Sequence, residues 1–296
     1  MHRRHAMGVL LFMGAGWGLT QPLTKIAVST GYEPLGLIFW QLVIGAVAMG
    51  ILRLVQGKPL AMPRRLWWFF LMIALLGTVL PNSFSFRAAA HLPAGIMSMV
   101  ISLVPMFAFP IALVLGIDRF NWLRLGGLVT GLIGVTILAE PSALPDAAMI
   151  IWLPVAVVAP LCYGLEGNVV SKWGTHGLGP GHVLFGASVM GAIVALPLAI
   201  GSGQFIDPRL TWGAPELALV ASSLIHVTVY TSYVWLVSRA GSVFAAQVAY
   251  VVTGTGVLWS MLLLGERYSL WVWAAMGLIL VGLFLVQPRS QDRVAP

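Results

Sequence analysis

Long apolar segments alternate with short polar or Gly/Pro-containing links along the whole chain. A helix that crosses the hydrocarbon core of a bilayer needs roughly 20 apolar residues. The residue-by-residue alternation of a membrane β-strand is not found, so the pattern predicts ten membrane-spanning helices. They are expected at 6–28, 35–55, 67–86, 93–116, 122–139, 149–171, 181–200, 215–237, 242–264 and 269–287.

The composition supports a membrane location. Of the 296 residues, 59% are hydrophobic and 8% are charged, whereas a soluble domain carries about 25% charged residues. These values, with a mean hydropathy of +0.94, exclude a soluble enzyme domain and a disordered protein. The net charge is +7, but the sixteen Lys and Arg are scattered between apolar segments, so lipid rather than nucleic acid is the expected partner.

Lys and Arg are divided unequally between the two sides that ten spans define. Twelve fall on the side of the N-terminus and four on the opposite side. Cytoplasmic links carry the excess of Lys and Arg, so both termini are predicted on the cytoplasmic side of the inner (plasma) membrane. The twelve are Arg3, Arg4, Arg53, Lys58, Arg64, Arg65, Arg119, Arg124, Lys172, Arg239, Arg289 and Arg293, and the four are Lys25, Arg87, Arg209 and Arg267.

The two halves of the chain repeat each other at a spacing near 148 residues. Each half holds five predicted helices, and five is odd, so the second half must enter the membrane inverted. Inverted repeats are typical of secondary transporters, and the alternative is a duplication without transport. The matching segments are Asp118-Arg119-Phe120 with Glu266-Arg267-Tyr268, and, with a slip of one residue, Trp17-Gly18-Leu19 and Lys25 with Tyr163-Gly164-Leu165 and Lys172.

Several motifs in both halves carry a family resemblance. Trp17-Gly18 is followed by Lys25, and the stretch from Ala88 to Gly95 is followed by Pro105 and then Asp118-Arg119. The second half contains Gly265-Glu266-Arg267. In order and spacing these motifs resemble the EamA-type ten-helix members of the drug/metabolite transporter superfamily, over essentially the whole chain.

This resemblance implies an all-α integral membrane protein with two inverted five-helix repeats around a central cavity. The repeats would be residues 1–140 and 141–296, and they would export or import small metabolites by alternating access. Two positions depart from the family pattern, which commonly has Arg where Gln41 stands and Pro where Thr253 stands. An Arg at the depth of residue 41 would suit an anionic group, so Gln41 argues against a strongly anionic substrate.

Polar residues inside apolar spans are the candidate substrate contacts, because a polar group facing lipid is costly. Glu166 is the only carboxylate well inside a predicted span, and it is a candidate for binding a substrate amine or for proton coupling. Its structural alternative is a partner for Lys172. His226, with Tyr230 one turn on, is a candidate for carrying a proton or for binding a substrate carboxylate. Its structural alternative is a hydrogen bond to a neighbouring helix.

The other candidates fall on helices that the resemblance places around the cavity. Asn82 follows Pro81, which breaks the helix, so a freed carbonyl group and the Asn82 amide can line a cavity. The alternative is a kink that serves only helix packing. Small hydroxyl groups also join helices to one another, which is the alternative for the two serines. The remaining candidates are Trp17 and Gln41, the stripe Ser98 and Ser102, and the stripe Gln247 and Tyr250.

Other chemistries lack their motifs in this sequence. No Walker-type phosphate loop, no His-Glu-x-x-His and no paired intramembrane aspartates occur, and the histidines are not spaced for a metal. We therefore expect no enzyme activity, no cofactor and no metal. The sequence predicts an exporter of a small amphipathic metabolite, amino-acid-like or planar aromatic. A membrane enzyme acting on a lipid-linked substrate, a non-transporting sensor and a homodimeric state stay open.

Overall fold

The computed structural model describes residues 3–140, 143–240, 242–245 and 247–286, and every regular element in these ranges is helical. The first half begins with the helices α1 and α2. The third span consists of a 3₁₀-helix, an α-helix, a π-helical turn and a second α-helix, and the fourth span consists of two α-helices. Their bounds are α1 Arg3–Ala27, α2 Pro34–Val55, η1 Arg64–Leu66, α3 Trp67–Ala74, η2 Leu75–Val79, α4 Leu80–His91, α5 Ala94–Ile101, α6 Val104–Val114 and α7 Trp122–Leu138.

The second half repeats this order. A short 3₁₀-helix leads into the sixth span, and a four-residue helix precedes the ninth. The bounds are η3 Ala147–Ile151, α8 Trp152–Trp173, α9 Pro180–Gly201, α10 Ala214–Ala240, α11 Ser242–Ala245, α12 Val248–Leu264 and α13 Leu270–Val286. The ten predicted spans each correspond to one helix or one pair of broken helices, which confirms the all-α fold class.

The lengths and compositions of the helices fit a membrane protein. Five segments in the described residues are long and apolar enough to cross a bilayer, and α7, α12 and α13 are shorter apolar helices of 17 residues. Helices α1 and α10, with 25 and 27 residues, are long enough to cross but carry more polar side chains. The five are Pro34–Val55, Arg64–His91, Ala94–Val114, Ala147–Trp173 and Pro180–Gly201.

Prolines interrupt the third and fourth spans, because proline lacks an N–H donor and clashes with the preceding turn. The π-helical turn Leu75–Val79 precedes Pro81, and the break between α5 and α6 precedes Pro105. The third span ends at His91 rather than at the predicted residue 86. Ala88, Ala89 and Ala90 favour a helix there, and the chain becomes extended only at Leu92, before Pro93.

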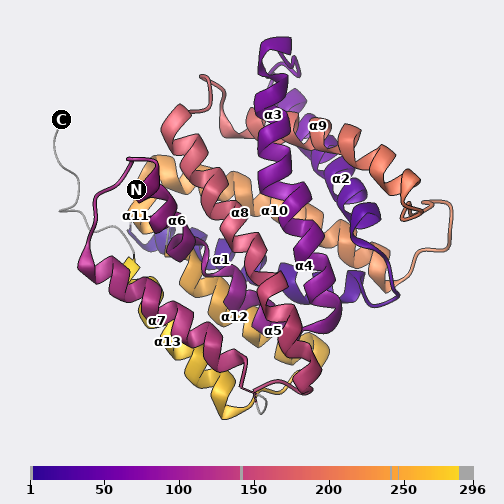
Figure 1. The fold of residues 1–296 in the computed structure, drawn as a ribbon. Coiled ribbons are helices and arrows are strands. Elements are labelled where there is room, and N and C mark those ends of the chain that lie inside the picture. The colour runs from indigo at the N-terminus through magenta and orange to yellow at the C-terminus, as the bar shows by residue number, and fades with distance from the viewer. Residues whose placement is uncertain (1–2, 141–142, 241, 246, 287–296) are drawn as a thin grey trace.

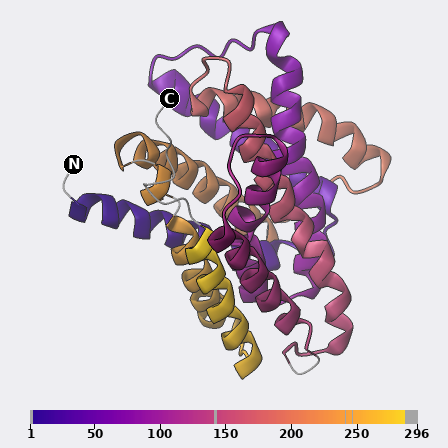
Figure 2. The same ribbon diagram turned by 60° about the vertical axis from the view of Figure 1, so that its left-hand side comes forward.

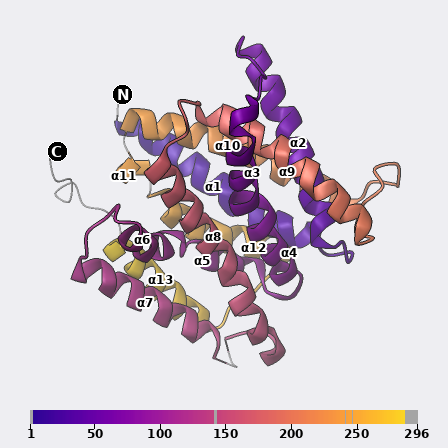
Figure 3. The same ribbon diagram turned by 45° about the horizontal axis from the view of Figure 1, so that its top comes forward.

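The two halves lie together around a shared interior. Helices α7 and α13 pack side by side along one flank, and α2 and α9 pack together on the opposite flank (Figures 1 and 3). Helix α1 packs against α10 and α12 between these flanks, and α8 packs against α4 and α6. Figure 2 shows the same arrangement with α13, in yellow, brought forward.

Equivalent glycine contacts in the two halves support the inverted repeat. A Cβ atom on Gly18 of α1 would lie 2.8 Å from the backbone nitrogen of Gly256 in α12. A Cβ atom on Gly164 of α8 would lie 3.0 Å from the backbone nitrogen of Ala108 in α6. Ala108 and Gly256 stand 148 positions apart, which is the spacing of the repeat. The first helix of each half therefore meets the fourth span of the other half in the same way.

The links between spans form two opposite faces. We call the face that contains the start of α1 the inner face, and the opposite one the outer face. The outer face contains the links 28–33, 92–93, 139–146, 202–213 and 265–269, of which 141–142 lie outside the described residues. The inner face contains the links after α2, α6 and α8, and the end of α13, where the Arg124 side chain donates to the Val286 carbonyl oxygen over 2.9 Å.

Candidate functional site

A row of hydrogen bonds joins α2, α4 and α8 in the interior. The Asn82 amide nitrogen donates to the Gln41 side-chain oxygen over 2.8 Å. The Tyr163 hydroxyl donates to the Asn82 side-chain oxygen over 3.1 Å. Asn82 is buried, and these two bonds satisfy both ends of its amide. Gln41 and Asn82, two predicted site residues, are thereby brought into direct contact.

Glu166 lies one turn beyond Tyr163 on α8, and its carboxylate faces the π-helical turn of the third span. A Cβ atom on Gly77 would lie 2.7–2.8 Å from both carboxylate oxygens, so the missing side chain at Gly77 makes the room that Glu166 occupies. No hydrogen bond or ion pair joins the carboxylate to another of the described residues. Lys172 instead donates to the Leu115 carbonyl oxygen over 2.8 Å.

Aromatic rings from α1 and α10 continue the site. Tyr230 and His226 stack with ring centroids 6.2 Å apart, and His226 lies 6.3 Å from Trp17. The Tyr233 ring lies against Trp17, with ring centroids 5.6 Å apart. The Glu166 carboxylate interacts electrostatically with the phenol group of Tyr230, as it does with that of Tyr163. Six of the predicted residues therefore belong to one continuous group: Trp17, Gln41, Asn82, Glu166, His226 and Tyr230.

Two members of this group were not among the predicted site residues. Tyr163 stands where the second repeat matches Trp17, and Tyr233 follows His226 and Tyr230 at positions i+4 and i+7 of one helical face. The repeat and the helical spacing were the available signals. Tyrosine is common in membrane helices for reasons unrelated to a site, so neither signal distinguishes these two from the other tyrosines.

The two predicted serines lie elsewhere, in the contact between α5 and α12. Ser98 is fully buried, its hydroxyl donates to the Ala94 carbonyl oxygen over 3.2 Å, and a Cβ atom on Gly256 would overlap its side chain. The Ser102 hydroxyl donates to the Met99 carbonyl oxygen over 2.6 Å. Both hydroxyl groups are therefore satisfied by the backbone of their own helix.

Gln247 and Tyr250 lie at the start of α12. Gln247 immediately precedes the helix, and its backbone nitrogen donates to the Phe244 carbonyl oxygen over 3.1 Å. The Tyr250 hydroxyl is buried and has no hydrogen-bond partner among the described residues. A buried hydroxyl without a partner is costly, so this group is suited to bind a ligand or a water molecule.

A cluster of polar contacts lies at the outer face, and we call Lys25, Glu266 and Tyr268, with the first residues of α5, the outer clasp. The Glu266 carboxylate accepts the backbone N–H groups of Ala94 over 2.8 Å and Gly95 over 3.2 Å. The Tyr268 hydroxyl donates to Glu266 as well. Burial and the neighbouring carboxylate raise the pKa of the Tyr268 phenol, so this group remains a donor.

Lys25 completes the outer clasp from α1. Its ammonium group donates to the carbonyl oxygens of Ala90 over 3.1 Å and Leu92 over 3.0 Å, at the end of α4. It also interacts electrostatically with Glu266. The outer clasp therefore joins the first half, through Lys25 and α5, to the link before α13 in the second half.

The equivalent residues of the inner face make different contacts. Asp118, which the repeat aligns with Glu266, accepts the Arg124 side chain over 2.5 Å and the Arg119 backbone N–H over 2.8 Å. Lys172, which aligns with Lys25, donates to Leu115 at the end of α6. These bonds hold the inner link to nearby residues of α6 and α7. In the described residues, the contacts at the two faces, which the repeat relates, therefore differ.

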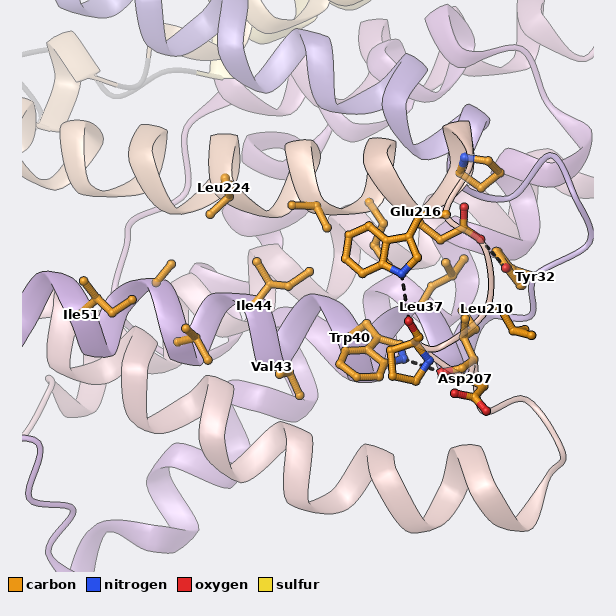
Figure 4. Close-up of a pocket in the computed structure, with 18 residues that line it drawn as sticks. Tyr32, Leu37, Trp40, Val43, Ile44, Ile51, Asp207, Leu210, Glu216 and Leu224 are labelled. Atoms are coloured by element: carbon orange, nitrogen blue, oxygen red, sulfur yellow. Dashed lines mark hydrogen bonds between the residues drawn. The ribbon is translucent and has the colours of Figure 1, made fainter.

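A separate apolar cavity of about 320 Å³ lies between α2, α10 and the link 202–213 (Figure 4). Val43, Ile44 and Leu224 line its length, and none of the predicted site residues lines it. Near the outer face the Trp40 indole donates to the Ile206 carbonyl oxygen over 2.9 Å, and the Tyr32 hydroxyl donates to Glu216. The lining of this cavity is almost entirely apolar, so it can pack against a ligand but offers few groups for hydrogen bonds.

Among the residues that the structure describes, no three His, Cys, Asp or Glu side chains lie close enough to hold a metal ion. The interior group contains one carboxylate, aromatic rings, an imidazole and amide groups. Such a set can bind a small molecule by charge, hydrogen bonds and stacking.

The comparisons with known proteins agree with this architecture. A model of the EamA-like transporter family matches residues 6–139 and again residues 150–287. A Streptantibioticus cattleyicolor protein named "Probable terminal-alkyne amino-acid exporter" is 22% identical over 293 residues, which cover 97% of this chain and 95% of that protein. An Archaeoglobus fulgidus protein named "Uncharacterized transporter" is 24% identical and covers 72% of this chain and 75% of its own length. A solved crystal structure superposes with a TM-score of 0.65 at 20% identity, over 94% of this chain and 98% of that one.

Proposed function

Because the chain belongs to the EamA-like transporter family, we propose that it is a secondary transporter that exports a small amphipathic metabolite by alternating access. The observation that carries this proposal is the convergence of polar and aromatic side chains from both halves on one interior group. Trp17, Gln41 and Asn82 come from the first half, and Glu166 and His226 come from the second. A substrate bound there touches both repeats, so their relative motion can change its access.

The proposed cargo is amino-acid-like or a planar aromatic compound. The relative from Streptantibioticus cattleyicolor is named an amino-acid exporter and aligns with nearly the whole chain, which supports the first alternative. The rings of Trp17, His226 and Tyr230 support the second. The excess of Lys and Arg on the side of the N-terminus supports an inner (plasma) membrane location with cytoplasmic termini.

The proposed motion exchanges the states of the two faces. In this conformation the outer clasp holds α5, and Asp118 and Lys172 are engaged at the inner link. The repeats 1–140 and 141–296 then rock about the interior. Asp118 accepts backbone N–H groups at the start of α11, as Glu266 does at the start of α5 in this conformation. Lys172 then takes the role of Lys25. Breaking one set of bonds while making its equivalent keeps the free-energy difference between the two conformations small, as alternating access requires.

Counterflow in proteoliposomes tests this function. Vesicles are preloaded with unlabelled amino acids and aromatic metabolites, and a trace of each labelled compound is added outside in turn, without an ion gradient. We expect transient accumulation of at least one label, because exchange through one site needs no energy source. The control is vesicles that contain the Gly18→Leu variant, in which a bulky side chain would overlap the Gly256 backbone.

The outcome decides between the proposed function and its alternatives. Accumulation of a label in vesicles with the native chain alone supports transport. Chemical conversion of a compound without movement across the membrane would instead indicate an enzyme. Binding without flux, with and without an imposed pH gradient, would indicate a sensor and would contradict the proposal.

A further inference from the structure

Glu166 presents a negative charge that the chain does not neutralise. In the described part of the chain, the Lys and Arg residues lie in links or near the ends of helices, so none of these shares the middle of a span with Glu166. Lys172, the cation nearest to it in sequence, is bound to the Leu115 carbonyl oxygen. The Glu166 side chain is half-buried inside a membrane span, where an unpaired charge is costly, so a bound cation or a proton has to compensate it.

The backbone around the carboxylate is shaped to hold it in position. Gly77 lies within the π-helical turn Leu75–Val79, and both carboxylate oxygens of Glu166 fill the space that a side chain at Gly77 would occupy. π-Helical turns are rare and occur frequently at functional sites. The third span therefore fixes the place of the carboxylate without contributing an opposite charge.

The remaining walls suit an organic cation. The Tyr163 and Tyr230 phenol groups interact electrostatically with Glu166. The row of rings continues from Tyr230 through His226 to Trp17, against which Tyr233 lies. A cation within about 6 Å of an aromatic centroid is attracted to the ring, and Trp and Tyr are the strongest partners. Gln41 and Tyr163 hold the Asn82 amide in place, and only one of its N–H groups remains for a substrate.

We infer that this site selects the ammonium group of its cargo: Glu166 pairs with the cation, and the aromatic rings of α1, α8 and α10 surround it. Organic amines therefore bind more tightly than the corresponding free amino acids, because none of the Lys and Arg that the structure describes lies in the middle of a span, where it could pair with a carboxylate. This inference rests on the proposed function only in taking the interior group as the substrate site.

Four compounds that share a phenyl ring test the inference: 2-phenylethylamine, 2-phenylethanol, phenylacetate and phenylalanine. Their affinities are measured on the purified full chain in lipid nanodiscs by isothermal titration calorimetry at pH 7. The amine is expected to bind about tenfold or more tightly than the alcohol and the amino acid, with phenylacetate weakest. Equal affinities, or no binding of the amine at millimolar concentration, would overturn the inference.

Variants assign the effect to Glu166. Glu166→Gln is expected to weaken binding of the amine about tenfold and to leave the alcohol unchanged, which also shows that the variant is folded. Gly77→Ala is expected to weaken the amine as well, because a Cβ atom there displaces the carboxylate. Glu33→Gln changes an exposed carboxylate before α2 and is the matched control, expected to have no effect.

The inference and the proposed function fail in different experiments. If Glu166→Gln weakens amine and alcohol equally, ammonium selectivity is contradicted whether or not counterflow is observed. If the native chain binds the amine selectively but never shows counterflow, the inference is supported and transport is contradicted.

Discussion

Replacing Glu266 by alanine is expected to release the start of α5 and to open the outer face. The variant loses two charge-assisted bonds to the Ala94 and Gly95 backbone and the partner of Tyr268. Hydrogen bonds to charged groups contribute about 1.5–3 kcal/mol each, and every 1.4 kcal/mol shifts a population about tenfold. Amide hydrogen exchange at residues 94 and 95, measured by mass spectrometry, should accelerate at least about tenfold.

Arg267→Ala is the matched control for this prediction. Arg267 is the exposed neighbour of Glu266, and it makes none of the bonds of the outer clasp described above. Exchange at residues 94 and 95 should remain at the native rate in that variant. If Glu266→Ala protects these two amides as well as the native chain does, the outer clasp does not hold α5, and the proposed closure of the outer face is wrong.

Gly18→Ala is expected to lower the stability of the fold, although alanine favours a helix more than glycine does. The added methyl group would overlap Thr255 and lie 2.8 Å from the Gly256 backbone nitrogen, so α1 and α12 have to separate. Overpacking of this kind costs about 1–3 kcal/mol. Thermal unfolding in detergent should show the loss as a lower midpoint temperature.

Gly8→Ala tests the same substitution in the same helix without the contact, because nothing lies within 4 Å of a Cβ atom at Gly8. Its midpoint should equal or slightly exceed that of the native chain. Equal midpoints for the two variants would show that the contact between α1 and α12 adapts freely, and would remove one support of the paired arrangement in the two halves.

The ten spans could be predicted from the sequence because the length of an apolar run is fixed by the thickness of the bilayer. Their ends were less predictable, as the extension of the third span to His91 shows. The close approach of α1 to α12 follows from Gly14 and Gly18, four residues apart on one helical face, since Cβ atoms there would overlap Val251 and Thr255.

The interior group was predictable where a residue violates the apolar rule, as Glu166 and His226 do. Tyr163 and Tyr233 do not violate it, so only the folded structure brings them to the group. The outer clasp was not predictable, because Glu266 binds backbone groups about 170 residues away. Its partners are backbone N–H groups, which every residue except proline has, so the residue types at 94 and 95 do not predict these bonds. The division of the chain at residues 140 and 141 stays a prediction.

Alternating access is the central claim, and distances across the two faces test it most directly. In a Cys162→Ser background, spin labels at residues 91 and 267 report the outer face. Labels at 239 and 119, which the repeat places 148 positions away, report the inner face, and all four native side chains are exposed. Double electron–electron resonance should show the outer pair close and the inner pair apart, and a transported compound should populate the reverse. Distances that stay fixed, or that lengthen together on both faces, would contradict the account.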